Sequence, residues 1–200
     1  MDYAIPIGIL IIVATIILVA IGKIKRRREH RALLFASARQ FVADVQQRKA
    51  LFPVESNVLL KSGETAFYSS PSALYETRAV RHYQSGFTGF RVAKGVYVGG
   101  SRGRSVSSQE WSEIGNGWLT ITNKRLIFDG GGASRNIALG KIVSIKSSLK
   151  GLEVSIEGRS KSVGFEAANG MITAAILNIC CQAENPLDLS QTKLNFTFEE

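Results

Sequence analysis

The sequence predicts an α+β protein: an N-terminal transmembrane helix and a helical stalk, then a small β-barrel or sandwich capped by a C-terminal helix. Three observations predict it: an uncharged apolar run at the start, a change from helical to alternating periodicity after Val58, and one last helical segment before residue 183. Many short strands followed by one helix are typical of such folds. The expected divisions are a transmembrane anchor at 1–23, a basic juxtamembrane stalk at 24–56, a domain at 57–183 and a tail at 184–200.

The first segment, Tyr3 to Gly22, carries no charge over 20 residues. At about 1.5 Å per residue, such a helix is roughly 30 Å long, which matches the hydrocarbon core of a bilayer. The alternative is a cleaved signal peptide, which has basic residues before a shorter apolar run. Here Asp2 precedes the run and the basic residues follow it. We therefore expect a retained single-pass anchor.

A basic cluster directly follows the apolar run, and it holds a net +5 of the chain's +9. Its members are Lys23, Lys25, Arg26, Arg27, Arg28 and Arg31, opposed by Glu29. The positive-inside rule places Lys23 onward in the cytoplasm and the first two or three residues outside. Because the charge is local, it does not predict a nucleic-acid partner, whose basic residues usually spread over the folded surface. The adjacent pair Cys180 and Cys181 argues against a structural disulfide and agrees with a reducing compartment.

The stalk, from Lys25 to Leu51, contains no glycine or proline. Apolar residues recur on one helical face, at Leu34, Ala38, Phe41 and Val45. Two interpretations stay open. The stalk packs on the domain or on a copy of itself, which would make a homo-oligomer, or it lies on the membrane surface with Arg26 to Arg28 on anionic headgroups. Proline at position 53 ends the helix.

Short strands follow, separated by Gly, Asn, Ser and Pro. We expect strands at 64–69 and 74–83 with a turn at 70–72, and a flexible glycine-rich loop at 85–104. A loop of this kind can instead cup an anion. The last helix runs to about Gln182 with Asn169 as its cap and Cys180 in the core. The "KLNFTFEE" tail alternates like an edge strand but is equally well a loose end.

The stretch "GWLTITNKRLIFDG", Gly117 to Gly130, predicts a tight β-hairpin. Asn123 suits its turn, because asparagine tolerates turn conformations and bonds to neighbouring backbone. We expect the corner to set strand register, with Lys124 fully exposed and the head of Arg125 in water above its apolar stem. The core-facing residues of the two strands are expected to be Leu119, Ile121, Leu126 and Phe128.

The hairpin resembles the central strands of GRAM and bacterial PH-like domains. The matching residues are Gly117, Leu119, Thr122, Asn123, Arg125, Leu126 and Phe128, followed by Ile137, Leu139 and Ile142. The resemblance covers about residues 59–182 and implies a PH-like domain at a bacterial plasma membrane, without implying any chemistry. Phosphoinositide-binding PH domains have a basic cluster around the first two strands. This chain has Arg78, Arg81 and His82 there, against Glu64 and Glu76, so that recognition is not implied.

These features favour a membrane-anchored cytoplasmic binding module that acts as an adaptor or scaffold for a protein partner. The alternative is a sensor of anionic lipid headgroups, and a hydrolase is less favoured because His82 and Ser85 lack an evident third partner. We expect no enzyme activity, no cofactor and no metal site. The candidate anionic-surface contacts are Lys25, Arg26, Arg27, Arg28, Arg91, Lys94, Arg102, Arg104, Lys124 and Arg125.

Overall fold

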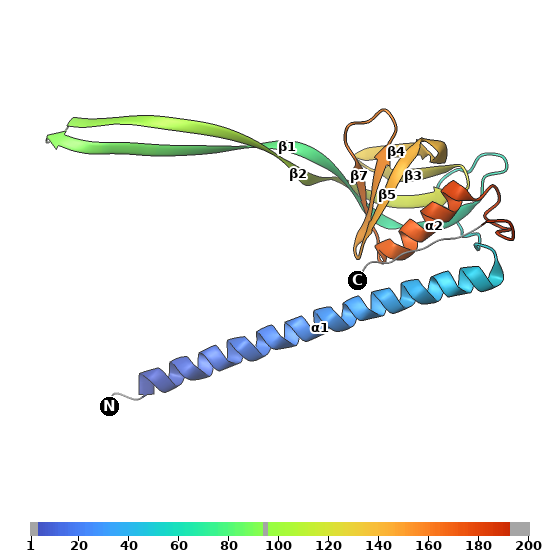
Figure 1. Cartoon of the computed structure of the whole chain (residues 1–200), viewed down its shortest axis with the longest axis horizontal. Helices are drawn as coiled ribbons and strands as arrows, with labels where there is room; N and C mark the ends of the chain where they lie inside the picture. Colours follow the sequence, from blue (N-terminus) through green and yellow to red (C-terminus); the bar gives the residue numbers. More distant parts are fainter. Residues whose placement is uncertain (1–3, 94–95, 193–200) are drawn as a thin grey trace.

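A long helix, an antiparallel sheet and a short terminal helix make up the protein (Figure 1). The computed structural model describes residues 4–93 and 96–192, with side chains described at 9, 12–78 and 110–192. The helices are α1 (Ala4–Arg48), the short 3-10 helix η1 (Leu139–Lys141) and α2 (Gly170–Gln182). The strands are β1 (Ala66–Ala93), β2 (Val96–Thr122), β3 (Arg125–Gly130), β4 (Ala133–Ala138), β5 (Ile142–Ser148), β6 (Gly151–Ile156) and β7 (Val163–Glu166). The prediction of an α+β protein with a helix at each end is confirmed.

The strands form one antiparallel sheet in the order β4-β3-β2-β1-β7-β6-β5. Its edge strands, β4 and β5, do not pair with each other in the part of the chain that the structure describes. The expected barrel or sandwich is therefore corrected to a single open sheet. Helix α2 packs on β5, β6 and η1 and also contacts β1 and β2, so the helix that was expected to cap a closed barrel covers the apolar face of the open sheet. With the apolar face covered by a helix, the core does not require strand closure.

A polar bridge links strands that the open sheet leaves apart. Glu76 of β1 accepts hydrogen bonds from Arg135 of β4, at 2.8 and 3.0 Å, and from Arg159 of the β6–β7 connection, at 3.2 Å. Burial by itself would raise the pKa of Glu76, but the hydrogen bonds and charges of the two arginines hold it below the usual value. The bridge thus ties β4 and the β6–β7 connection to the central strand.

The β2–β3 hairpin lies at the centre of the core, as the alternation predicted. Leu119 pairs with Phe128 and Ile121 with Leu126, and all four side chains are fully buried. The Phe128 ring lies 6.1 Å from that of Phe165, at a tilt of 43°. Aromatic pairs at this separation add to the stabilisation from buried area.

The predicted cap of the last helix, its end near Gln182 and the core position of Cys180 are confirmed. The Asn169 side chain accepts hydrogen bonds from the backbone N–H groups of Met171 and Ile172, which is the bonding of an N-cap. Cys180 lies in the core, and burial raises the pKa of its thiol to about 12. The "KLNFTFEE" segment, residues 193–200, lies outside the described residues.

Helix α1 is one continuous helix whose C-terminal part packs on the domain. Phe35 and Ala38 are buried against Met171 of α2, and Val45 enters the main core. Asn169 strengthens the contact, because its amide donates to the Leu34 carbonyl at 3.0 Å. The stalk therefore packs on its own domain, one of the two partners expected for it. Among the described residues, no helix combines the length and the hydropathy of a membrane span.

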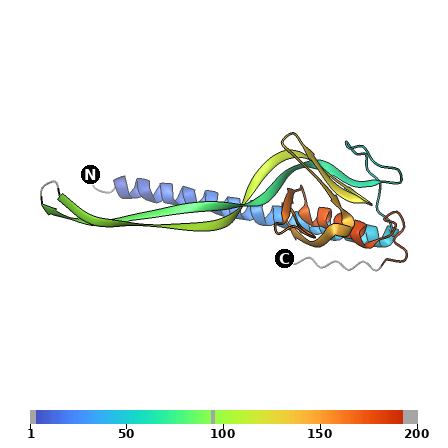
Figure 2. The same cartoon turned by 90° about the horizontal axis from the view of Figure 1, so that it is seen from above.

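The β1–β2 pair differs more from the sequence-based prediction than any other described element. The predicted turn at 70–72 is absent, because Pro71 pairs with Trp118 within a continuous β1. Proline is tolerated here since β7 pairs with β1 only along Leu74–Glu76, so one edge of the strand is free at Pro71. The predicted loop at 85–104 is also wrong where the structure describes it: residues 85–93 continue β1 and residues 96–104 belong to β2. The pair leaves the sheet as a two-stranded ribbon (Figures 1 and 2).

Candidate functional site

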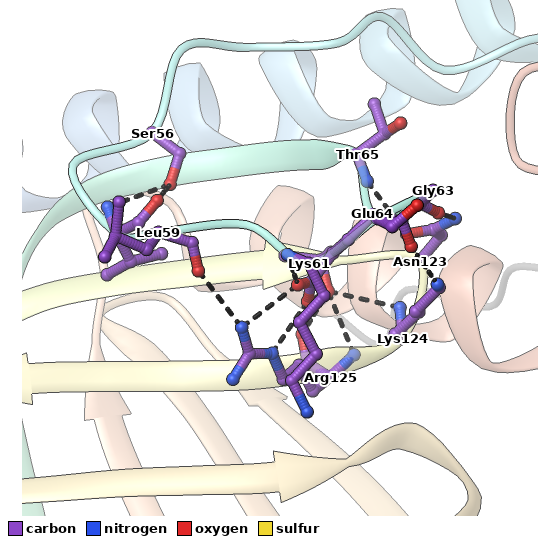
Figure 3. A network of polar contacts seen from close by, with 12 residues as sticks. Ser56, Leu59, Lys61, Gly63, Glu64, Thr65, Asn123, Lys124 and Arg125 are labelled. Carbon is purple, nitrogen blue, oxygen red and sulfur yellow. Dashed lines mark hydrogen bonds and ion pairs between the residues drawn. The ribbon is translucent and has the colours of Figure 1, made fainter.

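The corner at Asn123 and Lys124 is a network of polar contacts that fastens the segment before β1 to the β2–β3 hairpin (Figure 3). The Asn123 side chain accepts from the Thr65 N–H at 2.9 Å and donates to the Gly63 carbonyl at 3.2 Å. The Thr122 hydroxyl accepts from the N–H groups of Lys124 and Arg125 at 3.1 and 2.9 Å. These contacts explain how the corner sets the register of the strands.

Glu64 is the centre of this network, and its carboxylate is fully buried. Arg125 binds both carboxylate oxygens, at 2.8 and 3.0 Å, and the Thr122 hydroxyl and the Lys61 N–H add two more hydrogen bonds. Burial raises the pKa of Glu64, but these hydrogen bonds and the charge of Arg125 outweigh it and lower the pKa to about 2. The carboxylate is therefore ionised at neutral pH.

Two of the ten candidate anionic-surface contacts lie in this network. The expectation that the Arg125 head stays in water is wrong, because its guanidinium is held by Glu64 and by the Leu59 carbonyl at 3.2 Å. Lys124 is exposed, as expected, but its Nζ donates to the Ser62 carbonyl at 2.7 Å. Both cations thus serve the fold at this corner.

The other eight candidates fall into two groups. Lys25, Arg26, Arg27 and Arg28 are exposed on α1, ahead of the part that packs on the domain. Arg91, Arg102 and Arg104 lie on the ribbon, where Arg102 pairs with Gly86 and Arg104 with Gln84. Lys94 lies outside the described residues.

An uncovered apolar segment precedes the basic cluster on α1. The residues from Ile12 to Ile21 are all exposed, and they carry no charge. Ile16 is 61% exposed and Leu18 is 69% exposed, although they point to different sides of the helix. A helix that is apolar on every side is normally buried in a core or in a membrane. The described part of the chain does not cover this segment.

A groove of about 630 Å³ lies on the outer face of the sheet, where β1, β7, β6 and β5 are neighbours. Gly164 forms its floor: a Cβ there would lie 3.2 Å from the Trp111 ring and 3.3 Å from the Tyr75 Cβ. The glycine therefore makes room for Trp111, which remains 46% exposed. Sequence reasoning missed this site, because the exposed Trp111 gains a groove only through Gly164 on another strand.

Charged side chains of both signs line the same groove. Lys146 and Lys150 contribute positive charge, and Glu153 and Glu166 contribute negative charge. Burial, together with the nearby carboxylates of Glu166 and Glu113, raises the pKa of the Tyr75 hydroxyl. An apolar floor with charges of both signs suits a polypeptide segment better than a simple anion.

The stretch Gly99 to Gly103 has the spacing Gly-x-Ser-x-Gly, but it lies inside β2 and not at a strand-to-helix turn, where a nucleophile would be presented. No group of three potential metal ligands comes together in the part of the chain that the structure describes. Comparison with known proteins found no matching family model, no matching curated protein and no matching solved structure.

Proposed function

We propose that this protein is a membrane-anchored binding module, in which the segment Tyr3 to Gly22 spans the bilayer and a PH-like domain holds a protein partner at the cytoplasmic face. The observation that carries the proposal is the apolar segment of α1, exposed on all sides directly before a basic cluster. Span and cluster together are the pattern of a single-pass anchor with its positive flank inside. The strand order and the C-terminal helix support the PH-like part.

The groove at Trp111 is the proposed partner site. Tryptophan is enriched where proteins bind one another, because it offers a large, rigid apolar surface. Anchoring then increases the effective concentration of the module for any partner in the same membrane. The anchor supplies the location and the groove supplies the recognition.

Anchoring is tested by alkaline carbonate extraction of membranes that contain the full chain. The variant Ile16→Arg/Leu18→Arg places two charges in the apolar segment, and insertion then costs roughly 5–7 kcal/mol. We expect this variant to leave the membrane fraction. The control, Leu33→Arg/Leu59→Arg, changes two residues that are 68% and 95% exposed outside that segment, and it should stay in the membrane. Release of both variants, or of neither, contradicts the proposed anchor.

Recognition is tested by crosslinking and pull-down of the full chain in its native membrane. We expect Trp111→Ala to lose the crosslinked partner. Trp118→Ala is the matched control, since Trp118 lies on the same strand, is 39% exposed and does not line the groove. A partner that Trp111→Ala retains does not bind at the groove.

A further inference from the structure

The ribbon, residues 77–93 and 96–111, has no third strand beside it among the residues that the structure describes. In the described residues, β7 pairs with β1 only along Leu74–Glu76, and β3 pairs with β2 only along Gly117–Ile121. Beyond these points the two strands pair only with each other, out to Ala93 and Val96. A two-stranded hairpin alone is at best marginally stable in water. A ribbon of this length therefore requires a surface to lie on.

The composition of the ribbon indicates what that surface is. Glu110, at the base of the ribbon, is its only acidic residue, and residues 77–109 contain no Asp or Glu. Their basic residues are Arg78, Arg81, Arg91, Lys94, Arg102 and Arg104. Aromatic residues accompany them at Tyr83, Phe87, Phe90 and Tyr97. Basic residues are attracted to anionic lipid, and aromatic residues favour the interface between water and the acyl chains.

The direction of the ribbon brings it to the membrane that α1 is proposed to enter. Both views show the ribbon and the N-terminal part of α1 leaving the domain toward the same side (Figures 1 and 2). The helix between the packed Leu34 and the basic Lys23 spans only about 17 Å at 1.5 Å per residue. The ribbon is about 55 Å long at 3.3 Å per residue. It is therefore long enough to reach the headgroups with most of its length to spare.

The ribbon cannot continue into the hydrocarbon, because its outer edges carry unpaired backbone groups that lipid cannot satisfy. It must turn and follow the surface. A register shift between Leu74 and Tyr75, just before the ribbon begins, marks a bulge of the kind that bends a strand pair. This bulge lies at the base of the ribbon, where it can set the angle at which the ribbon approaches the surface.

We propose that the ribbon is a second membrane contact, which lies along the anionic headgroups of the bilayer that α1 enters and so fixes the orientation of the domain. The inference rests on the proposed anchor and adds a second, lipid-dependent contact to it. A basic ribbon could also bind nucleic acid. The shared direction with the apolar helix favours the membrane.

The test uses the full chain reconstituted in vesicles of zwitterionic lipid, with or without about one third anionic lipid. Chymotrypsin cuts at the ribbon aromatics Phe87, Phe90 and Tyr97. We expect anionic lipid to slow this cleavage about tenfold or more, since each basic residue strengthens contact with an anionic surface about fivefold. High salt should restore the rate, because it screens these attractions.

Two variants distinguish the ribbon from the rest of the surface. Arg91→Ser/Arg102→Ser/Arg104→Ser should lose the protection by anionic lipid. Lys61→Ser/Lys141→Ser/Lys161→Ser removes three exposed charges of the domain and should keep it. If chains that resist carbonate extraction are cleaved equally fast with both lipids, the proposed ribbon contact is overturned, whereas the proposed anchor is not. Chains that the carbonate wash removes overturn the anchor itself.

A separate experiment tests whether the ribbon binds nucleic acid instead of the membrane. A 30-base-pair DNA duplex is added to the zwitterionic vesicles at the same total negative charge. No protection by DNA supports the membrane contact. Protection by DNA that exceeds the protection by anionic lipid overturns it in favour of nucleic acid.

Discussion

The two ends of the β1–β2 pair have the same backbone hydrogen bonding and opposite surroundings. At the inner end, β7 and β3 flank the pair, α2 covers its apolar face and the Glu64–Arg125 network closes the corner. At the ribbon end, the described residues provide no flanking strand. The comparison teaches that strand pairing alone does not hold this fold: the free energy of folding comes from the core and from the buried polar network.

The largest effect is expected at the inner end, from Phe128→Ala. Phe128 is fully buried in the core, and truncation of such a side chain costs roughly 3–5 kcal/mol, enough to unfold a small domain. Denaturant unfolding followed by circular dichroism measures the loss. Phe52→Ala is the control, because Phe52 is 58% exposed and forms a cation–π pair with Arg48. Equal losses in the two variants would mean that the hairpin is not the centre of the core.

The next effect concerns Glu64, whose pKa is lowered to about 2 in the folded protein. Its contribution is complete above the unfolded pKa of about 4.5 and is lost as the pH falls through about 2. From the size of the shift, this contribution is on the order of 3 kcal/mol. We expect Glu64→Gln to lower stability by this order at pH 7 and to flatten its decline between pH 4.5 and 2.

Unfolding free energies at a series of pH values test this. Glu55→Gln is the matched control, because Glu55 is exposed on the same connecting segment. It should follow the native protein within about 0.5 kcal/mol, as surface substitutions usually do. A Glu64→Gln curve parallel to the native curve would remove Glu64 as the source of acid sensitivity.

A much smaller effect is expected from Lys124→Ala at the same corner. The Nζ of Lys124 makes one exposed hydrogen bond to the Ser62 carbonyl, so its loss should change stability by less than about 1 kcal/mol. Thermal melting measures this, and the pull-down measures partner capture, which should be unchanged. A variant that keeps its melting temperature but loses membrane or partner binding would make this corner a binding site.

The smallest effect on stability is expected at the ribbon end. Residues 79–109 can be replaced by Asn-Gly, because Arg78 and Glu110 pair directly across the strands and a two-residue turn suits this register. We expect the melting temperature of the domain to stay within about 2 °C, since the ribbon lies outside the core. A large drop in the melting temperature would show that the ribbon stabilises the sheet. The two ends of the β1–β2 pair would then no longer differ in their contribution to stability.

The sequence alone determined the elements whose signals are local. Each of these signals depends on residues within a few positions of one another. They are the uncharged run with its basic cluster, the α2 helix with its Asn169 cap, and the alternation of Leu119, Ile121, Leu126 and Phe128.

Only the tertiary structure decided the features that depend on residues distant in the sequence. The local sequence around Arg125 indicates an exposed cation, and only the fold places Glu64 beside it. In the same way, Trp111 forms a groove only because the fold places it above Gly164. The glycine-rich stretch 85–104 indicates a loop, yet residues 85–93 and 96–104 form strands because they pair with each other across the ribbon. Periodicity shows which side of an element is apolar. Strand pairing depends on two segments, and the sequence of one segment does not identify its partner.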